Sequence, residues 1–541
     1  MSLLTKEDFA LLELVMYIDQ DVLWAANPKW RVGFLDKYRD KYKGTYKKKK
    51  ELEAKALECA KEEFSSIIKK KIDEAASEKK ELVWLLDSLG LDDNGIGNMI
   101  KYQFGNDPNA TKRIPKEASV TEDAKATSGA VADIAEWVAV IKGLRENKKL
   151  INLKIIDRMV QFKKDSKGNV ITLDRGKKAE TNVTLALVYA SDTNPSQVIV
   201  TFKGTSGAWE WVDNFKGLYL DETPIQKEAL AFLRGLDADD IELVGHSKGA
   251  NKAMYCTLLD DRVSKCLGMD GQGFQEEFFK KYSKEISEKS YSIKNISTQA
   301  DFVHMLLSPL PKVNSFVKGT GIRSTAEFHC PLSIVLEDEN GYFVRKEFKH
   351  IDEAEGITKL HSVIQFWVNN MDQKEKEQIG TYLGNVAAFG IADDKTFNAN
   401  FQCDKVSELV LQDKDSLSLL LAYLVLYKDK YGLSKEDLNT ILDSLEVRLG
   451  GFDPIIRKIL PKILDAGAEK LLANEEEKPQ KVSLWQYIIN YFRSNKWYNQ
   501  WIGTKATKRE IDLFVSVWNM TKQKVKSIHI ERGDEDAKVL V

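Results

Sequence analysis

The sequence of 541 residues has few cysteines and no long hydrophobic run. Its five cysteines are odd in number and scattered, and no two have the C-x-x-C spacing of zinc or redox sites. This pattern is typical of a reducing compartment, so we expect a cytoplasmic protein. The longest nearly apolar run, Ser416 to Tyr427, is well short of the roughly 20 residues that span a bilayer. The N-terminus also lacks the basic and apolar segments of a signal peptide. The sequence therefore predicts a soluble protein without a transmembrane segment.

Neither sign of charge is in clear excess. The chain has 80 lysines and arginines against 82 aspartates and glutamates, a formal net charge of −2. It therefore has no global attraction to nucleic acid or to an anionic membrane, and we expect no nucleic-acid partner. A basic run at Lys47 to Lys50 is followed at once by Glu51, Glu53 and Glu58. These acids can pair with lysines at helical spacing, so a solvated helix face is favoured over an anion-binding patch.

The chain is too long for a single hydrophobic core, so two or three domains are expected. Residues 36–149 are rich in lysine and glutamate and have apolar residues at helical spacing, which predicts a helical insertion. A long loop is expected within it at 105–127. Residues 1–35 and 150–372 form the predicted core, in which short strands alternate with helices. This alternation indicates an α/β fold, a mostly parallel sheet with helices on both faces. Residues 373–541 predict a C-terminal helical domain.

Individual elements can be assigned within these regions. The predicted strands of the core are short apolar runs at Lys154–Phe162, Thr184–Ala190, Val198–Phe202, Ile241–Val244, Val263–Met269 and Ser292–Ser297. The predicted helices of the C-terminal domain are Leu409–Tyr431, Lys435–Arg448, Asp453–Leu472 and Lys508–Ile528. At the N-terminus, Thr5 to Asp8 has the pattern of a capping box, which predicts a helix through Tyr17.

The segment Ile241 to Ala250 carries the strongest chemical signal. A short apolar run ends in Gly-His-Ser-Lys-Gly and passes directly into a helical pattern. G-x-S-x-G between a strand and a helix is the pattern of a nucleophile elbow, where glycines avoid a collision with the neighbouring backbone. Ser247 is therefore the candidate nucleophile. The amide of Lys248, at the free N–H end of the following helix, is a candidate oxyanion donor.

A second strand, Val198 to Phe202, also ends in a glycine turn, Lys203-Gly204-Thr205. It lies upstream of the elbow, where a hydrolase of this architecture places its second oxyanion donor. Thr205 could offer both its amide and its hydroxyl. The alternative is an ordinary strand end with a polar turn.

The nucleophile needs a base, and in this architecture a histidine follows the acid along the chain. The sequence has only six histidines. His361 opens a helical pattern after a loop that contains Gly356, and a loop allows a base to reach across the sheet edge. We therefore expect His361 to be the base. The other histidines downstream of the elbow and before the far helical region are His304, His329 and His350.

Two carboxylates follow strands after the elbow. Asp270 stands just past the first such strand and Asp301 just past the second. The later position is the usual place of the acid in this architecture, so Asp301 is preferred and Asp270 is second.

The stretch from Val198 to Phe274, with F-K-G-T, V-G-H-S-K-G-A-N and M-D-G-Q-G-F, resembles the bacterial Mbeg1-like family of uncharacterised lipase-like proteins. These are relatives of the class 3 lipases in the α/β-hydrolase superfamily. The opening helix Phe9–Leu14 and the segments Asp301–Val303 and His361–Trp367 also fit the family pattern. The chain departs from it at three positions, Ser206, Ala250 and Gln272, which bear on substrate fit more than on the chemistry.

The resemblance implies Ser247 as nucleophile, Asp301 and His361 as its partners, and Thr205 at the oxyanion site. The expected activity is that of a serine hydrolase, a lipase or esterase, that cleaves a carboxylic ester of a small molecule or lipid. No metal or organic cofactor is expected. One alternative is a noncatalytic binding or scaffold protein that recruits a protein partner through its helical regions. Another is an acyltransferase or thioesterase that uses the same serine.

Overall fold

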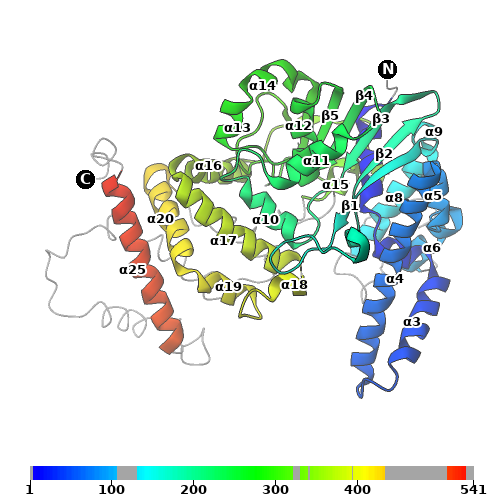
Figure 1. Ribbon diagram of the computed structural model, residues 1–541, viewed down its shortest axis with the longest axis horizontal. Coiled ribbons are helices and arrows are strands. Elements are labelled where there is room, and N and C mark those ends of the chain that lie inside the picture. The colour runs from blue at the N-terminus through cyan, green and yellow to red at the C-terminus, as the bar shows by residue number, and fades with distance from the viewer. Residues whose placement is uncertain are drawn as a thin grey trace. The chain divides into compact units, whose positions relative to one another are not determined.

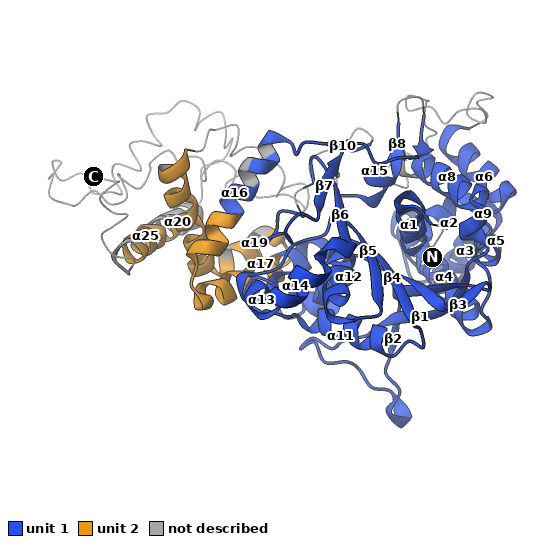
Figure 2. Cartoon of the chain, turned by 90° about the horizontal axis from the view of Figure 1, so that it is seen from above, with its two compact units in different colours: residues 1–364, 387–400 blue, residues 365–386, 401–541 orange. Residues whose placement is uncertain are grey.

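The chain divides into two compact units (Figure 2), and its helices and strands are labelled in Figure 1. Unit 1 contains Met1–Ile364 and Ala387–Asn400, and unit 2 contains Gln365–Val386 and Phe401–Val541. The computed structural model describes residues 4–105, 131–301, 303–320, 329–338, 341–392, 394–432 and 508–531.

The predicted division at residues 35, 149 and 372 into core, insertion and C-terminal domain stays a prediction. Residues 106–127 of the predicted loop lie outside the described residues, as do the predicted helices at 435–448 and 453–472.

Unit 1 is built on an eight-stranded sheet with the order β1-β2-β3-β4-β5-β6-β7-β10. The strands are β1 Lys154–Phe162, β2 Glu180–Ser191, β3 Asn194–Phe202, β4 Asp240–His246, β5 Val263–Met269, β6 Ile293–Thr298, β7 Asn314–Val317 and β10 His350–Ile351. Strands β3 to β7 pair in parallel, whereas β1, β2 and β10 pair antiparallel with their neighbours. A separate antiparallel pair consists of β8 Leu336–Glu337 and β9 Phe343–Val344. The six predicted strands correspond to β1 to β6, and the predicted α/β fold is confirmed.

The described part of the chain contains many helices around and beyond this sheet. In chain order they are α1 Lys6–Glu13, η1 Leu14–Tyr17, α2 Gln20–Ala26, α3 Pro28–Tyr42, α4 Lys49–Glu78, α5 Leu82–Ser88, α6 Asp93–Phe104, α8 Val131–Glu146, α9 Lys148–Ile151, η2 Asp174–Gly176, α10 Ala208–Lys216, α11 Pro224–Arg234, α12 Lys248–Leu259, α13 Glu276–Lys281, α14 Ser283–Lys289, η3 Ser290–Ser292, α15 Pro331–Val335, α16 Glu355–Asn370, α17 Gln373–Ala392, α18 Lys395–Asn398, α19 Val406–Gln412, α20 Lys414–Tyr431 and α25 Lys508–Glu531. The predicted capping box is present: the Thr5 side chain accepts from the Asp8 amide at 3.2 Å, and Asp8 accepts from the Thr5 amide at 2.8 Å.

The central strands bury both of their faces. Leu187 of β2 and Val244 of β4 belong to one hydrophobic cluster, whereas their neighbours Val188 and Leu243 belong to another. Side chains alternate between the two faces of a strand, so the two clusters lie on opposite faces of the sheet. The first cluster also contains residues of α1, α2, α6 and α8, and the second contains residues of α11, α12, α13 and α14. Helices of the predicted insertion, α6 and α8, therefore share a core with the sheet.

Unit 2 is helical in its described part. A single helix was predicted at Leu409–Tyr431, but the chain forms two helices, α19 and α20, with Asp413 between them. Asp413 accepts a hydrogen bond from the Ser416 amide at 3.0 Å, so it caps the second helix and interrupts the first. α20 packs against α25, where Lys524 pairs with Asp415 at 3.1 Å. Among the described residues, no helix is long and apolar enough to cross a membrane.

Candidate active site

Ser247 lies on a sharp turn between β4 and α12. Its backbone has φ 58° and ψ −123°, a conformation that side-chain-bearing residues rarely adopt. The turn requires glycine on both sides. A Cβ atom on Gly249 would lie 1.8 Å from the carbonyl oxygen of Phe202, and one on Gly245 would lie 2.4 Å from the backbone of Gly249. The strand, turn and helix expected around G-H-S-K-G are therefore present, for the steric reason that the sequence indicated.

The hydroxyl of Ser247 is within hydrogen-bond distance of a histidine. Ser247 Oγ lies 2.8 Å from Nε2 of His329, and the other ring nitrogen, Nδ1, lies 2.7 Å from Oδ1 of Asp301. His329 stands just before α15, and Asp301 follows β6 with its side chain fully buried. The three residues thus form a continuous serine–histidine–aspartate chain, in the order Ser, Asp, His along the sequence.

The histidine that contacts Ser247 is His329 and not the expected His361. His361 was predicted to approach Ser247, but it lies in α16, where Glu353 and His304 are the charged groups that act on it. Burial lowers the pKa of His361, and the carboxylate of Glu353 offsets only part of this effect. The structure brings Ser247 and Asp301 together as expected, but it places His329 between them.

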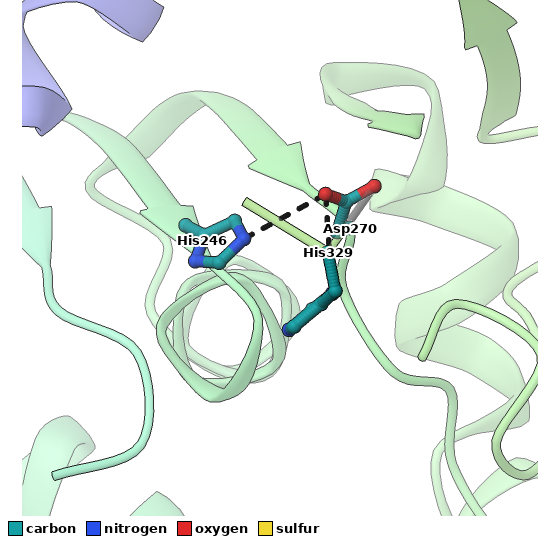
Figure 3. Close-up of side chains that lie close together, drawn as sticks. All are labelled: His246, Asp270 and His329. Carbon is teal, nitrogen blue, oxygen red and sulfur yellow. Dashed lines mark ion pairs between the residues drawn. The ribbon is translucent and has the colours of Figure 1, made fainter. Parts of the chain in front are cut away.

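The second carboxylate, Asp270, lies near both His246 and His329 (Figure 3). Its Oδ2 is 3.9 Å from His329 Nδ1 and 3.6 Å from His246 Nε2, while its Oδ1 accepts a hydrogen bond from the Thr298 amide at 3.1 Å. These separations exceed the 2.7 Å between His329 and Asp301. The distances therefore favour Asp301 over Asp270 as the partner of His329.

Asp301 also contacts a second histidine, which the sequence did not single out as part of the site. Oδ2 of Asp301 lies 3.0 Å from His304 Nδ1 and accepts from the His304 amide at 2.8 Å. His304 Nε2 lies 2.5 Å from Oε1 of Glu353, whose other oxygen accepts from the Thr358 hydroxyl at 2.7 Å. The hydrogen-bonded chain therefore runs from Ser247 through His329, Asp301 and His304 to Glu353. In the sequence, the contact between Asp301 and His304 is indicated only by their D-x-x-H spacing.

The charged groups of this hydrogen-bonded network stabilise one another's ionised forms. Burial alone would raise the pKa of Asp301, but its electrostatic interaction with His329 and hydrogen bonds from both histidines outweigh burial and hold that pKa below its usual range. Burial would lower the pKa of His304, yet its hydrogen bonds to Asp301 and Glu353 raise it to about 9. The pKa of Glu353 is lowered despite partial burial, mainly by the hydrogen bond from His304. Asp301 and Glu353 are thus held ionised and His304 cationic.

The two expected oxyanion donors lie beside the serine. Lys248 is the first residue of α12, where a backbone N–H has no acceptor within the helix. Its side chain is buried and its ammonium pairs with Asp213 at 2.9 Å. The turn before Thr205 packs against Ser247, since a Cβ atom on Gly204 would lie 3.3 Å from the Cβ atom of Ser247.

Two neighbours that no sequence pattern indicated hold the turn Lys203-Gly204-Thr205. The hydroxyl of Thr205 accepts from the Asn214 side chain at 2.8 Å. The hydroxyl of Tyr17 accepts from the Gly204 amide at 2.9 Å and lies 2.9 Å from His246 Nδ1. Tyr17 therefore ties the turn after β3 to the residue before the nucleophile.

The ligating atoms of His246, Asp270 and His329 lie within 4.8 Å of one another (Figure 3). A tetrahedral zinc ion with bonds of about 2.1 Å needs its ligand atoms roughly 3.4 Å apart, so these side chains would have to move closer together. Nδ1 of His329 already bonds to Asp301, and a metal at that atom would compete with this bond.

The fold and the site together describe an α/β protein with a serine–histidine–aspartate arrangement after the parallel strands β4 and β6. A family model described as Mbeg1-like matches residues 173–383. The resemblance to this family is therefore confirmed over these residues, which include Ser247, Asp301 and His329. No curated protein and no solved structure matches the chain.

Proposed function

We propose that this protein is a serine hydrolase that cleaves a carboxylic ester of a small molecule or lipid. The observation that carries the proposal is the hydrogen-bonded chain from Ser247 Oγ to His329 Nε2 at 2.8 Å and from His329 Nδ1 to Asp301 at 2.7 Å. The strained backbone of Ser247 supports it, because such strain persists only where the surrounding structure maintains it and is common at nucleophiles.

The first half of the reaction forms an acyl-enzyme. His329 Nε2 accepts the proton of Ser247 as Oγ bonds to the ester carbonyl carbon. Asp301 stays ionised, accepts a hydrogen bond from the Nδ1–H of His329 and stabilises the imidazolium. The amides of Lys248 and Thr205 donate to the oxyanion that develops on the carbonyl oxygen. When the tetrahedral intermediate collapses, the bond to the alcohol breaks and His329 returns its proton to the leaving oxygen.

The second half consumes water. His329 takes a proton from water as the water oxygen attacks the acyl carbon. The bond between the acyl carbon and Ser247 Oγ then breaks, and His329 returns that proton to Oγ. His304 and Glu353 act as positioning residues in both halves. His304 bonds to the second oxygen of Asp301, and Glu353 holds the other ring nitrogen of His304, so the first oxygen of Asp301 stays directed at His329. The free, buried thiols of Cys256 and Cys266 favour a reducing, cytoplasmic location.

Labelling by a fluorophosphonate probe tests the proposal, because the probe reports an activated serine whatever the substrate. Wild-type protein is expected to react, and Ser247→Ala and His329→Ala to lose labelling. The matched controls are His361→Ala and His350→Ala, which remove histidines that lie in α16 and on the exposed β10 and should leave labelling intact. Loss of labelling in His361→Ala with retention in His329→Ala would overturn the assignment of the base.

Substrate turnover separates the alternatives that share this serine. A short-chain p-nitrophenyl ester should be hydrolysed, and Ser247→Ala should lower kcat by roughly 10⁴-fold or more. Faster turnover of thioesters, or acyl transfer to an added alcohol in preference to water, would indicate a thioesterase or an acyltransferase. Folded wild-type protein that neither reacts with the probe nor cleaves any ester would indicate a noncatalytic scaffold.

A further inference from the structure

Helices α3 and α4 form a hairpin that projects from the rest of unit 1 (Figure 1). Its base is anchored by Phe64, which is fully buried and contacts the rings of Trp24 and Phe34 at centroid distances of 5.9 and 5.2 Å. By contrast, no residue of α3 is buried, so this helix presents most of its surface to solvent.

Along the shaft of the hairpin, basic side chains are neutralised by acids. Lys37 pairs with Glu63 at 2.7 Å, and Arg39 pairs with Glu53 at 2.8 Å, so both ion pairs join α3 to α4. Within α4, Glu58 pairs with Lys55 at 3.0 Å. Two of the three acids that were expected to neutralise the run at 47–50 are therefore paired with other residues.

The tip of the hairpin, residues 41–50, has a different balance of charge from the shaft. It contains six lysines and no acidic residue. Lys48 pairs with Glu51 at 3.0 Å, and Lys41 lies over the Tyr42 ring at 5.1 Å. Within the part of the chain that the structure describes, no ion pair is formed by the four remaining exposed lysines of the tip, which are Lys43, Lys47, Lys49 and Lys50. The tip thus carries a concentrated positive charge on a chain whose net charge is −2.

Tyrosines accompany these lysines. Tyr38, Tyr42 and Tyr46 follow one another at a spacing of four residues. Their rings are in contact, with centroids 6.5 Å apart for the first pair and 6.1 Å for the second. Tyrosine is enriched where a protein meets the headgroup layer of a bilayer, because its ring is apolar and its hydroxyl is polar. This row of three tyrosines ends at the same tip that carries the lysines.

We propose that the tip at residues 41–50 docks on an anionic phospholipid surface. Clustered lysines next to a membrane gain attraction from its negative surface potential, and each contributes roughly fivefold to the partition coefficient. A lipid surface fits better than a nucleic acid, because the tip is narrow, has lysine rather than the bidentate arginine, and carries partly exposed tyrosines. The docking does not depend on the esterase activity proposed above.

Cosedimentation of the full chain with vesicles tests the proposal. Wild-type protein should bind vesicles made of equal parts phosphatidylcholine and phosphatidylserine but not vesicles of phosphatidylcholine alone, and salt should weaken the binding. Replacing Lys43, Lys47, Lys49 and Lys50 by glutamine should lower the partition coefficient at least about 100-fold. These side chains are exposed, so circular dichroism should show an unchanged fold.

The matched control replaces four exposed lysines elsewhere in unit 1, Lys163, Lys167, Lys177 and Lys178, with the same loss of charge. This variant should bind anionic vesicles within a few-fold of wild type. Equal loss in both variants would show a diffuse charge effect and overturn the docking site. Absence of wild-type binding to the anionic vesicles, or stronger binding to single-stranded RNA that the tip substitutions abolish, would also overturn it.

Discussion

The position of His304 between two carboxylates makes a specific prediction about its charge. A neutral imidazole donates from only one of its two nitrogens, whereas the cation donates from both. In the structure each ring nitrogen faces a carboxylate oxygen, Asp301 at 3.0 Å and Glu353 at 2.5 Å. Both contacts are hydrogen bonds only if His304 is cationic, in agreement with its pKa of about 9.

The size of the effect follows from this pKa. A rise from 6.5 to about 9 corresponds to about 3 kcal/mol of favourable interaction in the folded state. Because the folded pKa lies above the unfolded one, this stabilisation is fully present below pH 6.5 and is lost as the pH rises through about 9. Glu353→Gln removes one of the two negative partners, so the pKa of His304 should fall by roughly 1–2 units.

Histidine-selective isotope labelling and NMR titration measure this directly, since the chain has only six histidines. His304→Gln assigns the signal. In the same pH range, the rate of fluorophosphonate labelling should decline in wild type as His304 loses its proton. The decline should begin at lower pH in Glu353→Gln. A wild-type His304 that titrates near 6.5, or a titration that Glu353→Gln leaves unchanged, would refute the positioning role of this pair.

Three further predictions concern the site and its backbone. Asp301→Asn should cut ester turnover severely, roughly 10⁴-fold by analogy with other serine triads, whereas Asp270→Asn should do much less; kcat for both variants decides between the carboxylates. Gly249→Ala should prevent a stable fold, because the new Cβ would meet a strand carbonyl oxygen at 1.8 Å, while Gly97→Ala in α6 has open space and should raise the melting temperature slightly; thermal unfolding compares the two. Thr205→Val should lower kcat by roughly 10² with KM nearly unchanged if its hydroxyl supports the oxyanion, and an unaltered kcat would leave only the backbone in that role.

Local patterns were sufficient to predict strands β1 to β6 of the sheet but not β7 and β10 at its other edge. The central strand β3 ends in a nearly continuous apolar run, Val198–Phe202, because both of its faces are buried there, and this signal is readable without knowledge of the partner strands. β7 and β10 have only four and two residues, too few to show any periodicity. The sharing of one core by α8 and the sheet depends on contacts between distant segments, so helical periodicity alone could not predict it.

The proposed nucleophile and the proposed base differ in what determines their positions. Ser247 is placed by its own neighbours, because the glycines at 245 and 249 are required within five residues of chain. His329, its hydrogen-bond partner, lies 82 residues farther along the chain, and no repeating sequence pattern marks its position. The criterion that favoured His361, a histidine beside a helix start, applies equally to His329, because Pro331 opens α15 two residues later. Proline at a first helical position marks the preceding residues as loop, so the sequence contained this signal. The choice between the two histidines required the long-range contacts of Asp301, which no local pattern encodes.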